Sequence, residues 1–102
     1  MEPRFQSVAR AADLLESSPV TVQVDSRKIA LFKISGDIFA LDDVCPHKGA
    51  PLGQGTVEGG NIFCPMHGWE FDIRTGICAD RPDRPAKCIP VRVVDGQVQI
   101  KL

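Results

Sequence analysis

The 102-residue sequence is poor in several residue types on which whole classes of protein depend. It contains one tryptophan, no tyrosine and only two histidines, His47 and His67. Lysine and arginine number 12 against 13 acidic residues, and this balance gives no reason to expect nucleic acid or an anionic membrane as a partner. No apolar run has the length of a membrane span. Because residues 1–20 also lack the basic start and apolar stretch of a signal peptide, we expect a cytoplasmic protein.

The sequence has no internal repeat and no long segment with the periodicity of an amphipathic helix. Residues 11–18 are expected to contain one helical turn. Short apolar or alternating segments recur instead, separated by turns, at residues 4–8, 20–24, 28–34, 38–41, 56–57, 62–63, 69–73, 88–94 and 97–102. Residues 28–34 are apolar on nearly both faces, which predicts a central strand, and Asp95-Gly96 is typical of a tight hairpin. The pattern predicts an all-β, antiparallel fold, and the length predicts one domain over residues 1–102.

The segment from Cys45 to His67 carries both histidines and two of the four cysteines. It begins with Cys-Pro-His and ends with Cys-Pro-Met-His, so each end supplies one thiol and one imidazole. The cysteines Cys45 and Cys64 are 19 residues apart, and the histidines His47 and His67 are 20 apart. Two near-equivalent half-sites of this kind suit two turns that face each other across one inorganic group.

Two inorganic groups take two cysteines and two histidines. In one variant of the [2Fe–2S] cluster, two Cys bind one iron and two His bind the other. The same four side chains also form a tetrahedral zinc set, which would act as a folding staple. Zinc motifs usually pair Cys with Cys and His with His at short spacings, whereas each pair here is mixed. The pattern therefore favours an iron–sulfur cluster, with a structural zinc module as the alternative.

The spacing C-x-H…C-x-x-H resembles that of the Rieske [2Fe–2S] family across the whole segment. The resemblance implies one cluster per chain, with Cys45 and Cys64 on one iron and His47 and His67 on the other. It also implies the Rieske fold, in which an antiparallel base, a sandwich or barrel, carries an inserted cluster-binding lobe at about residues 45–73.

This chain departs from the Rieske proteins of respiratory cytochrome complexes, which resemble C-x-H-x-G-C and C-x-C-H-G-S-x-Y. Ala50 and Met66 stand where those proteins carry a disulfide, and Trp69 and Phe71 stand where they carry Ser and Tyr donors. Fewer donors to the sulfurs predict a reduction potential near the low end of the Rieske span, about −150 mV. The chain instead resembles the soluble Rieske ferredoxins of bacterial oxygenase systems. Its Cys-Pro-His-Lys-Gly and His-Gly-Trp strings also resemble the small subunit of assimilatory NAD(P)H nitrite reductases.

The resemblance implies a one-electron carrier that docks at its histidine edge, between a flavin-dependent reductase and a terminal oxygenase. The alternative is a fixed subunit of a nitrite reductase. Because both histidines would bind the cluster, none remains for a mononuclear iron site or for activating a nucleophile. We therefore expect no catalytic residue and no enzyme activity in the chain alone.

The remaining cysteines, Cys78 and Cys88, are expected to be free thiols buried as small apolar side chains. An apolar collar around the docking edge is expected from Leu52, Met66, Trp69 and residues 82–85.

Overall fold

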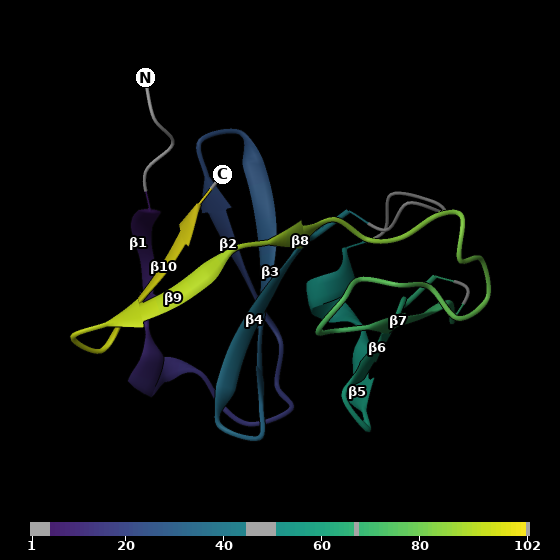
Figure 1. Ribbon diagram of the computed structural model, residues 1–102, viewed down its shortest axis with the longest axis horizontal. Helices are drawn as coiled ribbons and strands as arrows, with labels where there is room; N and C mark the ends of the chain where they lie inside the picture. The colour runs from purple at the N-terminus through teal and green to yellow at the C-terminus, as the bar shows by residue number, and fades with distance from the viewer. Residues whose placement is uncertain (1–4, 45–50, 67, 102) are drawn as a thin grey trace.

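The computed structural model of the protein describes residues 5–44, 51–66 and 68–101. In this part of the chain, β-strands form three antiparallel sheets (Figure 1). The first sheet has the order β1-β10-β9, with β1 at Phe5–Arg10, β9 at Val91–Val94 and β10 at Gln97–Lys101. The second has the order β2-β3-β4-β8, with β2 at Val20–Val24, β3 at Arg27–Ile34, β4 at Asp37–Asp42 and β8 at Cys88–Ile89. The third is β5-β6-β7, with β5 at Thr56–Glu58, β6 at Asn61–Phe63 and β7 at Glu70–Asp72.

The predicted all-β antiparallel fold is therefore confirmed, and so is the Asp-Gly hairpin. Asp95 and Gly96 connect β9 to β10 with φ angles of 51° and 75°. Both angles are left-handed, as a type I′ turn requires, and this turn matches the twist of the paired strands. Among the described residues, no helix is long and apolar enough to cross a membrane.

Strand β3 is central because both of its faces are buried. On one face, Ile29 and Leu31 pack into a cluster between the first two sheets, here called the base cluster. On the other face, Ala30 and Phe32 pack into a second cluster beneath the third sheet, here called the lobe cluster. Successive side chains of a strand point to opposite faces, so an apolar run of this kind serves both cores at once.

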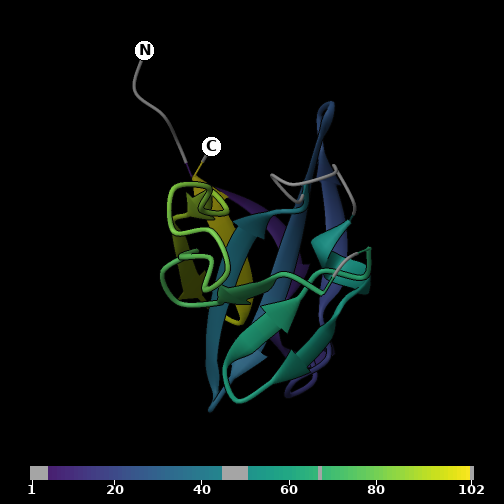
Figure 2. The same cartoon turned by 90° about the vertical axis from the view of Figure 1, so that its right-hand side faces the viewer.

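In Figure 2 the third sheet lies in front of the second sheet, and two clusters of buried side chains account for the packing of the three sheets. The base cluster consists of Leu14, Val24, Ile29, Leu31, Ala40, Ile89, Val98 and Ile100. The lobe cluster consists of Ala30, Phe32, Ile34, Leu41, Leu52, Ile62, Cys64, Phe71, Ile73, Cys78 and Ala86. Because the lobe cluster joins β3 and β4 to β6 and β7, the third sheet is packed against the second sheet.

The prediction of one strand over residues 88–94 is wrong. Residues Cys88–Ile89 pair with β4 in the second sheet, whereas Val91–Val94 pair with β10 in the first. Pro90 separates the two pieces. It has no N–H to donate to a ladder, and its carbonyl accepts a hydrogen bond from the Lys101 amide at 3.1 Å. The chain therefore crosses from one sheet to the other at this residue.

Two other elements are shorter than predicted. The helical turn expected within residues 11–18 is the 3₁₀ turn η1, at Ala11–Asp13. Beyond it, the Glu16 carboxylate accepts hydrogen bonds from the amides of Ser35 and Gly36, at 2.6 and 3.2 Å, and so holds the chain against the β3–β4 hairpin. The strand expected at residues 69–73 is β7, at Glu70–Asp72.

Candidate metal centre

Of the four predicted ligands, the described part of the chain contains Cys64, while Cys45, His47 and His67 lie outside it. Cys64 follows directly after β6, and its side chain is a free thiol with 2% of its surface exposed. It belongs to the lobe cluster.

A closed turn holds Cys64 in place. The Cys64 amide donates to the Trp69 carbonyl at 2.8 Å, and the Gly68 amide donates to the Cys64 carbonyl at 2.9 Å. Gly68 has a φ of 73°, a conformation that glycine adopts at little cost. Because β6 and β7 pair on either side, residues 64–69 are the connection of a hairpin, here called the second ligand turn.

The two ends of the segment that contains Cys45 and His47 in the sequence are also joined to each other. Val44 and Pro51 form an antiparallel bridge, and the Leu52 amide donates to the Asp43 carbonyl at 2.7 Å. Residues 44–52 are here called the first ligand loop. It continues into the 3₁₀ turn η2 at Leu52–Gln54, and the buried side chain of Leu52 anchors that end in the lobe cluster.

The two segments run side by side at one point. A Cβ placed on Gly55 would lie 2.2 Å from the Phe63 carbonyl oxygen, so only glycine permits this approach of the two backbones. Gly55 ends the turn that follows the first ligand loop, and Phe63 immediately precedes Cys64. The described chain after the first ligand loop and the chain just before Cys64 are therefore fixed against one another at Gly55 and Phe63.

Asp43 was missed by the sequence reasoning. It is buried at the neck of the first ligand loop, and its carboxylate accepts a hydrogen bond from the Gly53 amide at 2.7 Å. Its signal in the sequence is an aspartate between a strand and a cysteine motif, where a short carboxylate can accept hydrogen bonds from nearby amides.

The predicted apolar collar is partly corrected. Leu52 is fully buried in the lobe cluster and cannot form a collar. Met66 is 59% exposed, and Trp69 is half-buried and packs against the lobe cluster. Pro82 and Pro85 lie on an exposed loop. Val44, which was not predicted, is 53% exposed.

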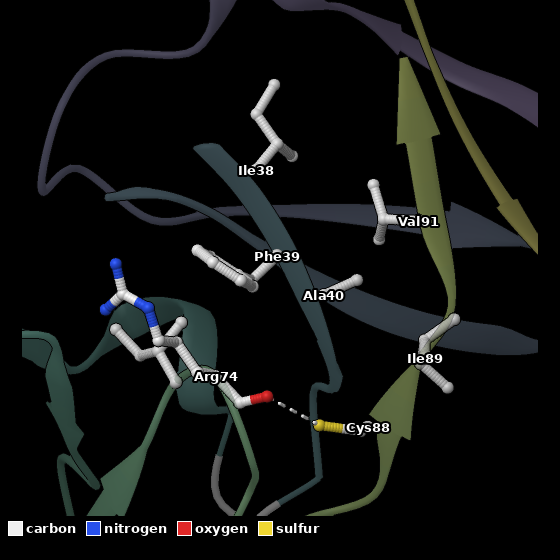
Figure 3. Close-up of a pocket in the computed structure, with 8 residues that line it drawn as sticks. Ile38, Phe39, Ala40, Arg74, Cys88, Ile89 and Val91 are labelled. Carbon is white, nitrogen blue, oxygen red and sulfur yellow. Dashed lines mark hydrogen bonds between the residues drawn. The ribbon is translucent and has the colours of Figure 1, made fainter. Parts of the chain in front are cut away.

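The prediction for the other two cysteines is right for Cys78 and wrong for Cys88. Cys78 is fully buried, whereas Cys88 is exposed on the edge strand β8. Figure 3 shows the Cys88 thiol beside a cavity of about 170 Å³, where its sulfur donates a weak hydrogen bond to the Arg74 carbonyl at 3.6 Å. Partial burial, and secondarily the negative charge of Asp72, raise the pKa of the Cys88 thiol above its ordinary value.

The described residues fit the expected cofactor. A buried free thiol stands at the start of a closed turn, as a cluster-binding cysteine requires. Among the residues that the structure describes, no group of three or more His, Cys, Asp or Glu side chains offers a competing metal site. The model of the Rieske [2Fe-2S] domain matches residues 4–95. The chain belongs to the Rieske family.

Relatives and solved structures agree with this assignment. The chain is 37% identical over 91 residues to the anthranilate 1,2-dioxygenase ferredoxin subunit of Burkholderia cepacia, covering 88% of this chain and 84% of that one. It is 36% identical to the naphthalene 1,2-dioxygenase ferredoxin component of Pseudomonas putida, covering 100% and 99% of the two chains. A Sphingomonas yanoikuyae B1 ferredoxin superposes with a TM-score of 0.89 at 33% identity, covering 97% and 99%.

A further structure is a complex of reduced oxygenase and oxidised ferredoxin in carbazole 1,9a-dioxygenase, which the chain matches with a TM-score of 0.86 at 30% identity, covering 95% and 92%. A putative nitrite reductase small subunit of Mycobacterium tuberculosis, at 24% identity and a TM-score of 0.88 over 100% and 97%, shows the shared fold alone.

These findings decide several of the predictions. The cofactor is a Rieske-type [2Fe–2S] cluster, which makes the structural zinc alternative wrong. The Rieske protein is an electron carrier and not an enzyme by itself.

Proposed function

We propose that this Rieske protein is the ferredoxin of a bacterial oxygenase system, working in the cytoplasm. It accepts single electrons from a flavin-dependent reductase and passes them to a terminal oxygenase. The observation that carries this proposal is the end-to-end match with a dioxygenase ferredoxin component, which covers 100% of this chain and 99% of the relative. The complex of a similar ferredoxin with its oxygenase supports the second partner.

The proposed ligands are Cys45 and Cys64 on one iron and His47 and His67 on the other. The closed turn at Cys64 and the close approach of Gly55 to Phe63 support a site built between two adjoining segments. The bound cluster supplies the one-electron couple, and two neutral imidazoles in place of two thiolates raise its potential above that of an all-cysteine cluster. Residues 1–102 act as one domain, with residues of about 45–73 as the cluster-binding lobe.

The proposed docking surface is the histidine edge with the two exposed apolar side chains next to the ligands. Val44 directly precedes Cys45, and Met66 directly precedes His67. Their exposed fractions of 53% and 59% leave apolar surface available to a partner. Apolar side chains at the centre of a contact exclude water, which suits a carrier that must bring its cluster close to two different partners.

Ligand substitutions in the purified holoprotein test the assignment. Changing Cys45, His47, Cys64 or His67 to Ala is expected to abolish the visible absorption and the equal iron and acid-labile sulfide content, since cluster binding and folding are coupled. Cys78→Ser and Cys88→Ser are the matched controls and are expected to retain the cluster. Loss of the cluster in either control, or its retention in a ligand variant, contradicts the assignment.

Electron transfer in a reconstituted system tests the role. The protein is expected to support reduction of a terminal oxygenase by a flavin reductase, and to elute alone in size-exclusion chromatography. Met66→Gln is expected to slow transfer with an unchanged midpoint potential, whereas Val93→Gln, at a 48% exposed valine on β9, leaves the rate unchanged. A stable stoichiometric complex with a nitrite reductase large subunit would favour the fixed-subunit alternative.

A further inference from the structure

Asp43 is the one polar or charged side chain that is buried among the residues the structure describes, with 2% of its surface exposed. Burial of a carboxylate is costly unless hydrogen bonds replace its water. Its Oδ1 accepts one hydrogen bond from the Gly53 amide at 2.7 Å and another from the Thr21 hydroxyl at 3.1 Å. The side chain thus joins β2 to the residue that directly follows the first ligand loop.

The main chain of Asp43 also forms hydrogen bonds to the second sheet and to the end of the first ligand loop. Its amide donates to the Lys28 carbonyl of β3 at 3.0 Å, and its carbonyl accepts from the Leu52 amide at 2.7 Å. The Val44–Pro51 bridge closes the next position of the loop. One residue therefore ties both ends of the first ligand loop to each other and to the second sheet.

Gly53 shows how tightly this neck is packed. A Cβ on residue 53 would lie 2.1 Å from the Thr21 hydroxyl oxygen and 2.9 Å from Asp43 Oδ1. Real Cβ atoms do not approach other atoms so closely, so only glycine fits. The loop end cannot shift toward the sheet, and a shift away breaks the hydrogen bond to the carboxylate.

We propose that Asp43 is a positioning residue of the cluster site. By clamping the two described ends of the first ligand loop, Asp43 restrains the segment of the sequence that carries Cys45 and His47. The inference rests on the proposed ligand assignment and adds a residue that does not itself bind the cluster. Groups that orient metal ligands contribute about 10- to 100-fold to metal affinity or activity.

The test measures two properties of the holoprotein: the rate of cluster loss to excess EDTA, followed by visible absorption, and the midpoint potential. Asp43→Ala is expected to lose its cluster about tenfold faster than the wild type. Asp43→Asn keeps an oxygen that can accept both hydrogen bonds and is expected to restore most of the retention. Because the potential depends on hydrogen bonds to the sulfurs and on exposure, a displaced loop is expected to shift the midpoint in Asp43→Ala.

Two controls separate positioning from general instability. Val98→Ala removes volume from the base cluster, far from the loop, and is expected to lower the urea midpoint without shifting the potential. Asp42→Asn removes the charge of a neighbouring side chain that is 28% exposed and faces Arg27 at 3.6 Å, but keeps the oxygen that accepts a hydrogen bond from the Val44 amide at 3.5 Å, and is expected to behave as the wild type. If Asp43→Ala matches Val98→Ala in both cluster loss and potential, the positioning role is overturned.

If Asp43→Ala does not fold, Thr21→Val decides the question. It removes one of the two hydrogen bonds and is expected to speed cluster loss about threefold. A rate equal to that of the wild type overturns the proposal. Retention of the cluster in Cys45→Ala would instead overturn the ligand assignment, so the two failures are distinguishable.

Discussion

Gly76 approaches the Ala86 carbonyl so closely that a Cβ on residue 76 would lie 2.3 Å from the oxygen. The Ala86 amide also donates a hydrogen bond to the Gly76 carbonyl at 2.8 Å. This contact fastens the end of the long loop after β7 to the turn at its start. It closes this loop at its base.

Gly76→Ala and Gly36→Ala are therefore expected to differ although both glycines have φ near 80°. Among the described residues, a Cβ at Gly36 meets nothing within 4 Å, so that variant loses only about 1 kcal/mol from the left-handed conformation. Gly76→Ala adds a backbone clash and is expected to cost about 2–4 kcal/mol in total. Urea unfolding of the two variants measures this difference, and equal costs would show that the loop moves aside freely.

Gly68 in the second ligand turn and Gly96 in the β9–β10 turn are expected to be equal in their effect on stability but to differ in their effect on the cluster. Gly68 and Gly96 have φ of 73° and 75°, and at neither would a Cβ meet a described atom within 4 Å. Substitution by Ala is expected to lower the unfolding free energy by about 1 kcal/mol at each position. Only Gly68→Ala is expected to speed cluster loss to a chelator, because its turn carries Cys64. Equal cluster loss in both variants would mean that the turn conformation does not control the site.

A further prediction concerns the effect of residue 71 on the reduction potential of the cluster. The wild-type midpoint is expected near the low end of the Rieske span, about −150 mV, since the chain has no Tyr and Phe71 stands where the resemblance to the respiratory Rieske proteins would put a Tyr donor. Phe71 is fully buried in the same cluster as Cys64. Phe71→Tyr is expected to raise the midpoint in voltammetry, whereas Phe5→Tyr adds the same hydroxyl on β1 of the first sheet, outside the lobe cluster, and leaves the midpoint unchanged. An unchanged midpoint in Phe71→Tyr would place residue 71 away from the cysteine sulfurs.

The two remaining thiols are expected to react very differently. Cys88 is exposed, but its raised pKa lowers the fraction of thiolate at a given pH, so alkylation is slower than for an ordinary exposed thiol. Its rate should rise with pH and level off only above the ordinary thiol pKa. Asp72→Asn removes the charge that contributes to the shift and should move this profile to lower pH. Cys78 should stay unmodified in the folded protein, and mass spectrometry of the alkylated chain distinguishes the two.

Local signals in the sequence determined most of the strands and the kind of cofactor. Alternation at residues 20–24 and the Asp95-Gly96 turn act over a few neighbouring residues, and both predictions are confirmed. The apolar run of β3 predicted a central strand because a strand buried on both faces needs no polar side. The mixed Cys and His spacing indicated the cluster because each ligand type has its own chemistry.

Tertiary structure decided what depends on partners distant in the sequence. The two pieces on either side of Pro90 enter different sheets because Cys88–Ile89 pair with β4 and Val91–Val94 pair with β10. Cys78 forms a backbone β-bridge with Phe71 and is buried in the lobe cluster, whereas Cys88 is not part of the base cluster that its neighbour Ile89 enters. Asp43 reads in sequence as a surface carboxylate. Only the fold, by bringing Thr21 and Gly53 to its oxygen from 22 and 10 residues away, makes its burial possible.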